Sequence, residues 1–292
     1  MGVPVKKPDP FHSFIAGGVA GAIECVATYP LEYAKTRLQL VDKSNKMPRN
    51  PLVLISTVAR TQGVSAVYVG CPAIVVGNTA KVSVRFLGFG CVKRALVDKD
   101  GKLSGPGGVI AGLSAGLLES VAVTPAEAIK TAKIDDKQSL KPKYQDGVCG
   151  TFRLIKDIGV KGLYSGLLPV AMRLGADSAV RFGSYLKMKG ALQDWSNTPR
   201  DKPLSSGMTF LLGAFAGIVT VYTTMPIDTV KTRMQSLDAS KQYSSTLDCF
   251  VKIFKNEGVM TFWRGATPRL GRFILSSGII ITSYEKMLVI LA

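Results

Sequence analysis

Residues 30–39 read P-L-E-Y-A-K-T-R-L-Q, residues 125–132 read P-A-E-A-I-K-T-A, and residues 226–235 read P-I-D-T-V-K-T-R-M-Q. In each copy a proline is followed two residues later by an acid and five residues later by a lysine. The copies recur at intervals of about a hundred residues, which indicates an internal repeat.

Other features recur in register with this motif. Two glycines precede each proline: Gly17 and Gly21, Gly112 and Gly116, Gly213 and Gly217. An aromatic residue, one further residue and a glycine follow it, with another proline close behind: Gly70 and Pro72, Gly166 and Pro169, Gly265 and Pro268. We therefore divide the chain into three repeats, residues 1–100, 101–198 and 199–292.

Each repeat is expected to hold a long helix through the motif proline, a short amphipathic helix and a second long helix. The expected ranges are 11–40, 51–60 and 71–97, then 108–137, 147–156 and 168–192, then 205–235, 246–255 and 267–291. The prolines should kink the first helices, and the glycine pairs should let helices approach closely. The fold class is thus an all-α membrane protein with six spanning helices, pseudo-threefold symmetry and both termini on one side.

Composition narrows the function. The 292 residues are 47% hydrophobic and carry a net charge of +17, which argues against disorder and indicates an anionic partner. The basic residues lie within apolar, glycine-rich helices, so nucleic acid is not expected. His12 is the single histidine, the five cysteines form no CxxC pair, and there is no phosphate loop or nucleophile–base pair. No enzyme activity, metal or cofactor is expected, and the N-terminus resembles no cleaved signal.

The repeated P-x-[DE]-x-x-[KR] motif with its downstream aromatic-x-G resembles the mitochondrial carrier family over essentially the whole chain. Within that family, F-I-A-G-G-V-A-G, N-T-A-K-V-S-V-R-F-L-G-F and I-D-D-K-Q-S resemble the fungal tricarboxylate carriers. The resemblance implies a monomeric inner-membrane antiporter that exchanges citrate, isocitrate or cis-aconitate for malate or another tricarboxylate by alternating access. It also implies termini in the intermembrane space and bound cardiolipin, with which Gly147 and Gly150 are compatible.

The acid and the base of each motif lie one helical turn apart. In a threefold ring each acid can reach the base of the neighbouring repeat, and in the family such pairs close the matrix side. The matrix-gate residues are Glu32, Lys35, Glu127, Lys130, Asp228 and Lys231. Gln39 and Gln235 occupy the family's bracing position, where the second repeat has Ile134. A solvated helix face is the alternative interpretation.

The gate on the opposite side departs from the family pattern, [FY]-[DE]-x-x-[KR]. Its charged residues here are Lys93, Lys189 and Glu285, so only one acid remains. At most one ion pair can form, which predicts a weak cytoplasmic gate and an unloaded protein that favours the cytoplasm-open state.

Aligning the second helices on their aromatic-x-G motifs defines a substrate level. The aligned positions are Gly77, Arg173 and Arg272, then Lys81, Asp177 and Ser276, then Arg85, Arg181 and Ile280. Steps of four keep them on one helix face. Five cations at membrane depth are tolerable only around water and an anion, and guanidinium groups suit carboxylates. Snorkelling or structural pairing is the alternative for Arg85 or Arg181.

Two departures suggest altered selectivity. Citrate carriers read R-Q and then an amide where this chain has Leu174 and Asp177, so we expect a less hydroxylated tricarboxylate, such as cis-aconitate, to be exchanged for malate or citrate. A specialised cis-aconitate exporter that feeds cytosolic biosynthesis is the alternative. Glu24 and Glu119 lie near the cavity and could carry a proton during exchange, or could be structural partners of Arg85 or Arg181. A channel or proton uniporter on the same fold remains an alternative.

Overall fold

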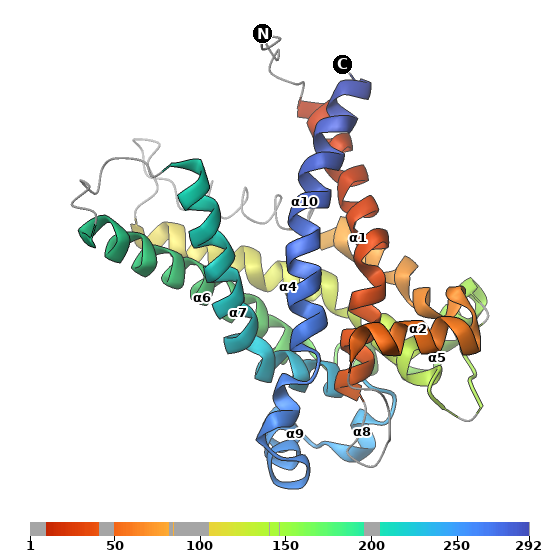
Figure 1. Cartoon of the computed structure of the whole chain (residues 1–292). Coiled ribbons are helices and arrows are strands. Elements are labelled where there is room, and N and C mark those ends of the chain that lie inside the picture. Colours follow the sequence, from red (N-terminus) through yellow and green to blue (C-terminus); the bar gives the residue numbers. More distant parts are fainter. Residues whose placement is uncertain are drawn as a thin grey trace.

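The computed structural model describes residues 10–40, 50–81, 84, 105–139, 141–145, 147–195 and 205–291, without the side chains of 10–16, 105–115, 206, 277, 281, 284, 285 and 288–291. Every regular element within these ranges is a helix or a helical turn (Figure 1). The expectation of an all-helical chain is therefore confirmed for the described residues.

The predicted helices appear in the expected order, with one additional short helix, α8, in the third repeat; most of the predicted 71–97 helix beyond residue 81 lies outside the described residues. The first contains α1 (Pro10–Leu40), α2 (Pro51–Gln62), a 3₁₀ turn (Val64–Tyr68) and a helix over 71–81. The second contains α4 (Gly105–Asp136), α5 (Gly147–Leu163) and α6 (Leu167–Trp195). The third contains α7 (Ser206–Met234), α8 (Ala239–Gln242), α9 (Thr246–Lys252), a π turn (Ile253–Glu257), a 3₁₀ turn (Val259–Trp263) and α10 (Ala266–Leu291).

Local sequence explains where the short helices begin and end. The side chain of Asn50 caps α2 by accepting a hydrogen bond from the Leu52 amide at 3.0 Å. Gly63, Gly159 and Gly258 follow the short helices at the same place in each repeat, with φ of 85°, 62° and 88°. This left-handed conformation favours glycine and stops the helix. Gly159 therefore interrupts α5 soon after its predicted end at 156.

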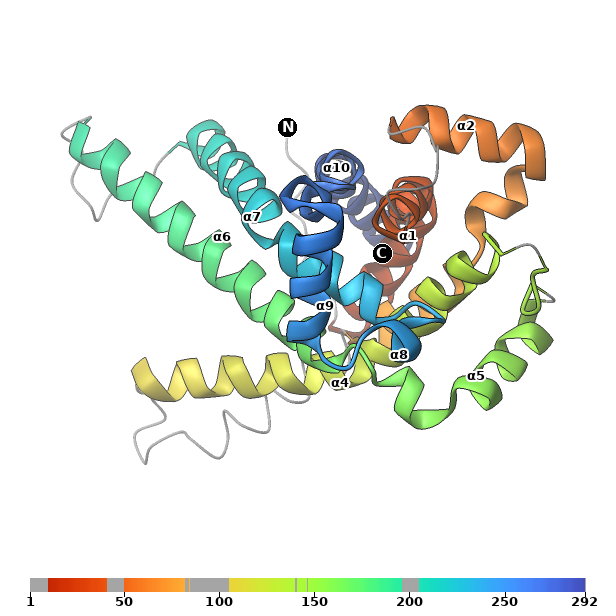
Figure 2. The same cartoon turned by 90° about the horizontal axis from the view of Figure 1, so that it is seen from below.

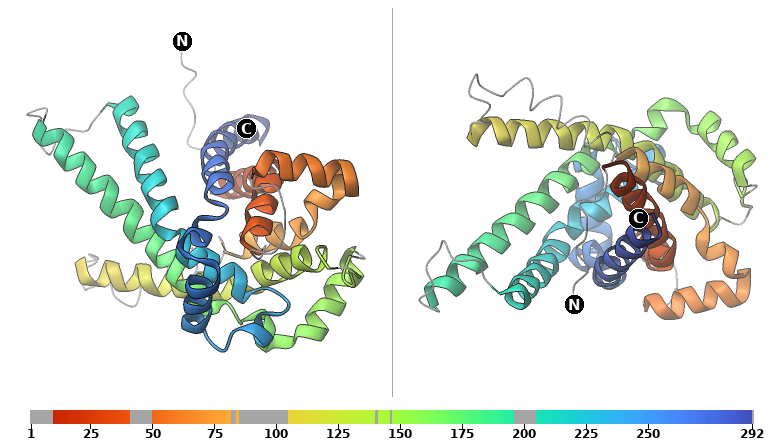
Figure 3. Two further views of the ribbon diagram at one scale, coloured as in Figure 1. Left: turned by 60° about the horizontal axis from the view of Figure 1, so that its bottom comes forward. Right: turned by 90° about the horizontal axis from the view of Figure 1, so that it is seen from above.

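The first helix of each repeat continues through its motif proline, at Pro30, Pro125 and Pro226. The motif-bearing ends of α1, α4 and α7 come together, whereas α4, the α6–α7 pair and the α1–α10 pair extend from this centre in different directions (Figures 2 and 3). The three motifs are thus gathered at one end of the described bundle.

Contacts between repeats close the ring. α10 packs against α1 and α6 packs against α7, so the second helix of one repeat meets the first helix of the next. Between the first and second repeats the contact is very close, because a Cβ built on Gly77 would lie 2.4 Å from the Cβ of Ala126 on α4. The repeat order along the chain is therefore also the spatial order.

The predicted role of the glycine pairs is wrong at most positions that the structure describes. A Cβ built on Gly17, Gly21, Gly116 or Gly213 would meet no heavy atom of the described residues within 4 Å. Gly217 is the exception, since its Cβ would lie 2.3 Å from the ring of Phe273. Gly112 lies among the residues whose side-chain environment is outside the description.

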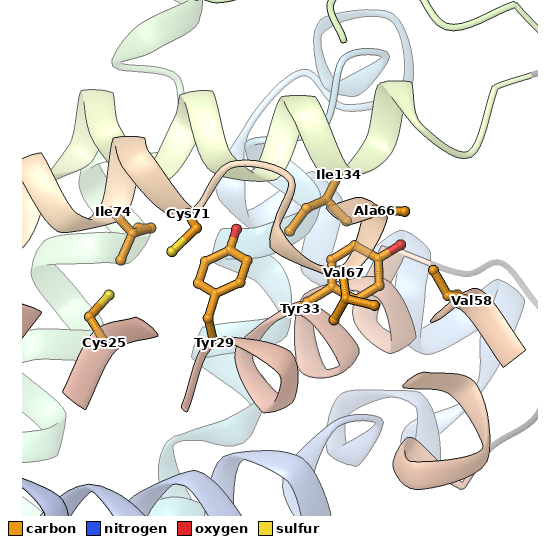
Figure 4. Packing of buried hydrophobic residues seen from close by; sticks show 9 residues of the cluster. All are labelled: Cys25, Tyr29, Tyr33, Val58, Ala66, Val67, Cys71, Ile74 and Ile134. Atoms are coloured by element: carbon orange, nitrogen blue, oxygen red, sulfur yellow. The ribbon is translucent and has the colours of Figure 1, made fainter. Parts of the chain in front are cut away.

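An apolar cluster holds the first repeat to α4 (Figure 4). Its members are Cys25, Tyr29 and Tyr33 of α1, Val58, Ala66, Val67, Cys71 and Ile74, and Ile134 of α4. Ile134 and Tyr33 are fully buried, so apolar packing stabilises the interface between the first and second repeats. The other two interfaces between repeats have a glutamine at the position of Ile134.

Candidate functional site

Three buried ion pairs join the repeats. Lys130 Nζ lies 2.5 Å from Glu32 Oε1, Lys231 Nζ lies 2.7 Å from Glu127 Oε1, and Lys35 Nζ lies 2.6 Å from Asp228 Oδ2. The exposed fractions of these six side chains lie between 0% and 13%, which excludes a solvated helix face. The expectation that each acid reaches the base of a neighbouring repeat is confirmed.

Glutamines lie at two of these interfaces, and one of them contacts an ion pair directly. Gln39 Nε2 donates to Asp228 Oδ2 at 3.0 Å, while the hydroxyl of Thr232 donates to Gln39 Oε1 at 2.8 Å. In the equivalent place, the hydroxyl of Thr131 donates to Gln235 Oε1 at 3.3 Å. Hydrogen bonds to the remaining oxygens stabilise a buried ion pair, so Gln39 directly complements Asp228.

The aromatic-x-G motifs supply surfaces against which the next repeat packs. A Cβ on Gly70 would lie 3.1 Å from Lys130 Cα, and one on Gly265 would lie 3.1 Å from the Lys35 carbonyl oxygen. A Cβ on Gly166 would lie 2.8 Å from Gln235 Cγ. The two repeated motifs therefore occur together because the glycine of one repeat contacts the charged motif of the next.

The predicted substrate-level arginines reach the same acids. Arg272 Nη1 lies 2.8 Å from Glu32 Oε2. Arg173 lies 3.5 Å from Glu127 Oε1 through Nη2 and 3.6 Å from Asp228 Oδ1 through Nε. Arg272 thus forms one charged group with Glu32 and Lys130, and Arg173 forms a second with Glu127, Asp228 and their lysines. We call the two groups together the charged network.

Further carboxylates lie on the side of this network away from the motifs. Glu24 Oε1 accepts a hydrogen bond from Ser276 Oγ at 2.6 Å and lies 3.7 Å from Arg272 Nη2. Lys81 Nζ lies 3.2 Å from Glu119 Oε1. Glu24 and Glu119 therefore contact Arg272 and Lys81. Of the two structural partners offered by the sequence, Arg85 or Arg181, Arg85 lies outside the described residues.

The remaining predicted residues are placed as follows. The guanidinium of Arg181 lies 5.0 Å from the ring centroid of Phe273, a cation–π contact. Leu174 and Lys189 are half-buried on α6. Arg85 and Lys93 lie outside the described residues, and Glu285 is described only by its helical backbone.

Sequence reasoning missed Arg269. Its Nη2 lies 2.8 Å from Asp177 Oδ1, and Arg173 Nη1 lies 3.0 Å from Asp177 Oδ2, so one carboxylate bridges α6 and α10. The equivalent residues of the other repeats, Ile74 and Val170, are apolar, so the repeat alignment did not mark this position. Arg269 lies three residues before Arg272, on the same face of the helix, and this spacing could have indicated that both face the same site.

Comparison with known proteins gives three matches to one family along the chain. The profile of the family described as "Mitochondrial carrier protein" matches residues 6–100, 102–195 and 202–292. The chain is 63% identical to the "Tricarboxylate transport protein" of Saccharomyces cerevisiae, over 97% of each chain. It is 45% identical to "Mitochondrial citrate transporter A" of Aspergillus niger, over 96% of this chain and 92% of the relative. It is 37% identical to "Tricarboxylate transport protein, mitochondrial" of Mus musculus, over 98% and 91%.

Proposed function

Because this chain belongs to the mitochondrial carrier family, we propose that it is a mitochondrial tricarboxylate carrier, a transporter and not an enzyme. The observation that carries the proposal is the group of Arg173, Arg269 and Arg272, which already bind carboxylates of the protein itself. Guanidinium groups arranged in this way are suited to the carboxylates of citrate and related anions. The exchange partner is malate or a second tricarboxylate.

The proposed setting is the inner membrane, spanned by six helices with both termini in the intermembrane space. One described helix, Gly207–Met234, is long and apolar enough to cross a membrane by length and composition. The others carry large apolar side chains on exposed faces, such as Leu117 and Val121 on α4 and Phe182 on α6. Exposed apolar surface of this kind supports contact with lipid. Cardiolipin near Gly147 and Gly150 and a monomeric carrier are parts of the same proposal.

The proposed mechanism couples binding to gating. The three formed ion pairs of the motifs correspond to a carrier closed on the matrix side. A substrate carboxylate that binds Arg272 competes with Glu32, and one that binds Arg173 competes with Glu127 and Asp228. Binding therefore weakens the electrostatic support of the matrix gate. The cytoplasmic gate of Lys93, Lys189 and Glu285 is weak and favours the cytoplasm-open state when no substrate is bound.

Proton coupling through Glu24 or Glu119 would make the exchange of a trianion for a dianion electroneutral. Both carboxylates are buried and contact cations of the substrate level, so either would be released when substrate takes its place. Replacing both by glutamine should flatten the pH dependence of uptake. An unchanged pH profile would exclude this role.

The test of the function is uptake of labelled citrate into proteoliposomes that contain the purified protein and are preloaded with citrate, cis-aconitate, malate, ATP or buffer. Internal citrate and malate should both drive uptake, and ATP should not. Uptake into vesicles that hold buffer alone would instead favour a channel or uniporter. The names of the relatives do not favour the specialised cis-aconitate exporter expected from Leu174 and Asp177.

A further inference from the structure

One aligned position of the second helices touches a carboxylate in the first and third repeats and is itself a carboxylate in the second. This position is occupied by Lys81, Asp177 and Ser276, each eleven residues after its aromatic-x-G glycine. Lys81 contacts Glu119 of the second repeat at 3.2 Å, and Ser276 contacts Glu24 of the first repeat at 2.6 Å. Asp177 is itself a carboxylate and contacts Arg269 of the third repeat at 2.8 Å. Each of the three interfaces between repeats therefore holds one carboxylate at this level.

The interface between the second and third repeats reaches this result by a different route. Glu24 and Glu119 occupy the same position of the first helices, six residues before the motif proline, where the third repeat has Thr220. The hydroxyl of Thr220 donates to the carbonyl of Ala216 at 2.6 Å and supplies no charge. The acid of this interface is supplied instead by Asp177 on α6. We call Glu24, Glu119 and Asp177 the internal carboxylates.

Each internal carboxylate contacts a cation that is predicted to bind the substrate, and one of them also contacts a cation next to such a residue. Glu119 engages Lys81, and Glu24 lies 3.7 Å from Arg272. Asp177 engages both Arg173 and Arg269, and through Arg173 it is connected to Glu127 of α4 and Asp228 of α7. Such cations at membrane depth are costly without a counter-charge, so carboxylates of the protein must balance them when no anion is bound.

We infer that the three internal carboxylates take the places of the substrate's carboxylates in the unloaded carrier, so that a tricarboxylate binds by displacing them from Lys81, Arg173 and Arg272. The inference rests on the proposed function and adds the reason for a preference in substrate class. At each of the three interfaces a substrate carboxylate can replace an internal carboxylate. A tricarboxylate can replace all three, whereas a dicarboxylate can replace only two. Affinity is then the difference between two sets of similar ion pairs.

The test removes one internal carboxylate at a time, with Glu24→Gln, Glu119→Gln and Asp177→Asn. Binding to purified carrier in detergent is measured as the citrate concentration at which half of the carrier is occupied, the dissociation constant, obtained from the rise of the unfolding temperature with citrate concentration. Because each variant removes a competitor for the cations, this concentration should fall about three- to tenfold. The malate concentration at which half of the carrier is occupied should fall less, so the preference for citrate over malate should rise. The matched control, Asp157→Asn, removes a carboxylate that accepts a hydrogen bond from Tyr144 beside α5 and should leave both values unchanged.

The outcomes separate the inference from the function beneath it. Unchanged or weaker citrate binding in the variants, with wild-type protein stabilised by citrate, would overturn the inference alone. A wild-type protein that neither binds nor exchanges any tricarboxylate would overturn the proposed function. The ratio of the citrate and malate dissociation constants does not depend on the fraction of folded protein. The three variants test the inference separately, so the other two still test it if one folds poorly.

Discussion

The guanidinium of Arg272 lies 2.8 Å from the carboxylate of Glu32, although the two residues are 240 positions apart in the chain. Glu32 also holds Lys130 at 2.5 Å. One acid is therefore shared between a residue of the predicted substrate level and a lysine of the predicted gate. An anion that binds Arg272 therefore competes directly with the carboxylate that also holds the gate lysine.

Replacing Arg272 by lysine should raise the KM for citrate about tenfold or more, because an ammonium group cannot form the paired contacts of a guanidinium. The measurement is citrate–citrate exchange in proteoliposomes over a range of external citrate. Arg60→Lys is the matched control, since Arg60 is exposed on α2 and takes part in none of the ion pairs described above. Equal KM values for the two variants would remove Arg272 from the binding site.

Replacing Asp228 by asparagine should lower the free energy of unfolding by about 3 to 5 kcal/mol, because Lys35 would remain buried without its counter-charge. Thermal unfolding of the purified carrier in detergent measures the effect. Asp238→Asn is the control, because its pair with Lys241 is exposed, with exposed fractions of 59% and 79%. That variant should unfold at the wild-type temperature. A similar loss in both would mean that burial does not distinguish the two pairs.

Replacing Gly70 by alanine should destabilise the carrier. Gly70 has φ of 84°, and its Cβ would lie 3.0 Å from Tyr29 Oη and 3.1 Å from Lys130 Cα, so both conformation and space oppose a side chain. The loss should be about 1 to 3 kcal/mol in a comparison of unfolding temperatures. Gly175→Ala, on α6 with no described atom within 4 Å of its Cβ, should be neutral or slightly stabilising. A neutral Gly70→Ala would contradict the close packing described above.

Cys149 and Cys249 should differ strongly in reactivity, although both lie on the short helices between the long ones. Cys149 is exposed, whereas Cys249 is fully buried, and burial raises the pKa of the Cys249 thiol to about 12. At pH 8 only about one Cys249 thiol in ten thousand is the reactive thiolate. In variants that retain a single cysteine, a maleimide should label Cys149 within minutes and Cys249 only after denaturation. Rapid labelling of Cys249 in the folded carrier would contradict its burial.

Much of the architecture was predictable because the information is local and repeated. Helical periodicity, the capping residue Asn50 and the recurring prolines are properties of short segments, so the helix bounds follow from the sequence to within a few residues at most ends. The threefold repeat also indicated that the three motifs lie close together in space. It correctly predicted that Glu32, Glu127 and Asp228 pair with lysines of neighbouring repeats.

The pairing within the charged network was not predictable in this way. Arg269 has no charged counterpart in the other repeats, and Asp177 breaks the symmetry by supplying an acid from α6 where the third repeat has Thr220. The glycine pairs also misled, because their spacing fits close helix contact but no described neighbour reaches Gly17 or Gly213. Such deviations from symmetry depend on which neighbour a side chain actually meets.

By itself, the sequence determined the three repeats, most of their helices, the family and the pairing of the three motif acids with lysines of neighbouring repeats. Only the tertiary structure decided which acid engages which cation, that Arg269 joins the network, and that Ile134 lies in an apolar cluster where two other interfaces use glutamine. The physical reason is that backbone periodicity specifies the face of a helix, whereas the partner on that face depends on how helices pack against one another.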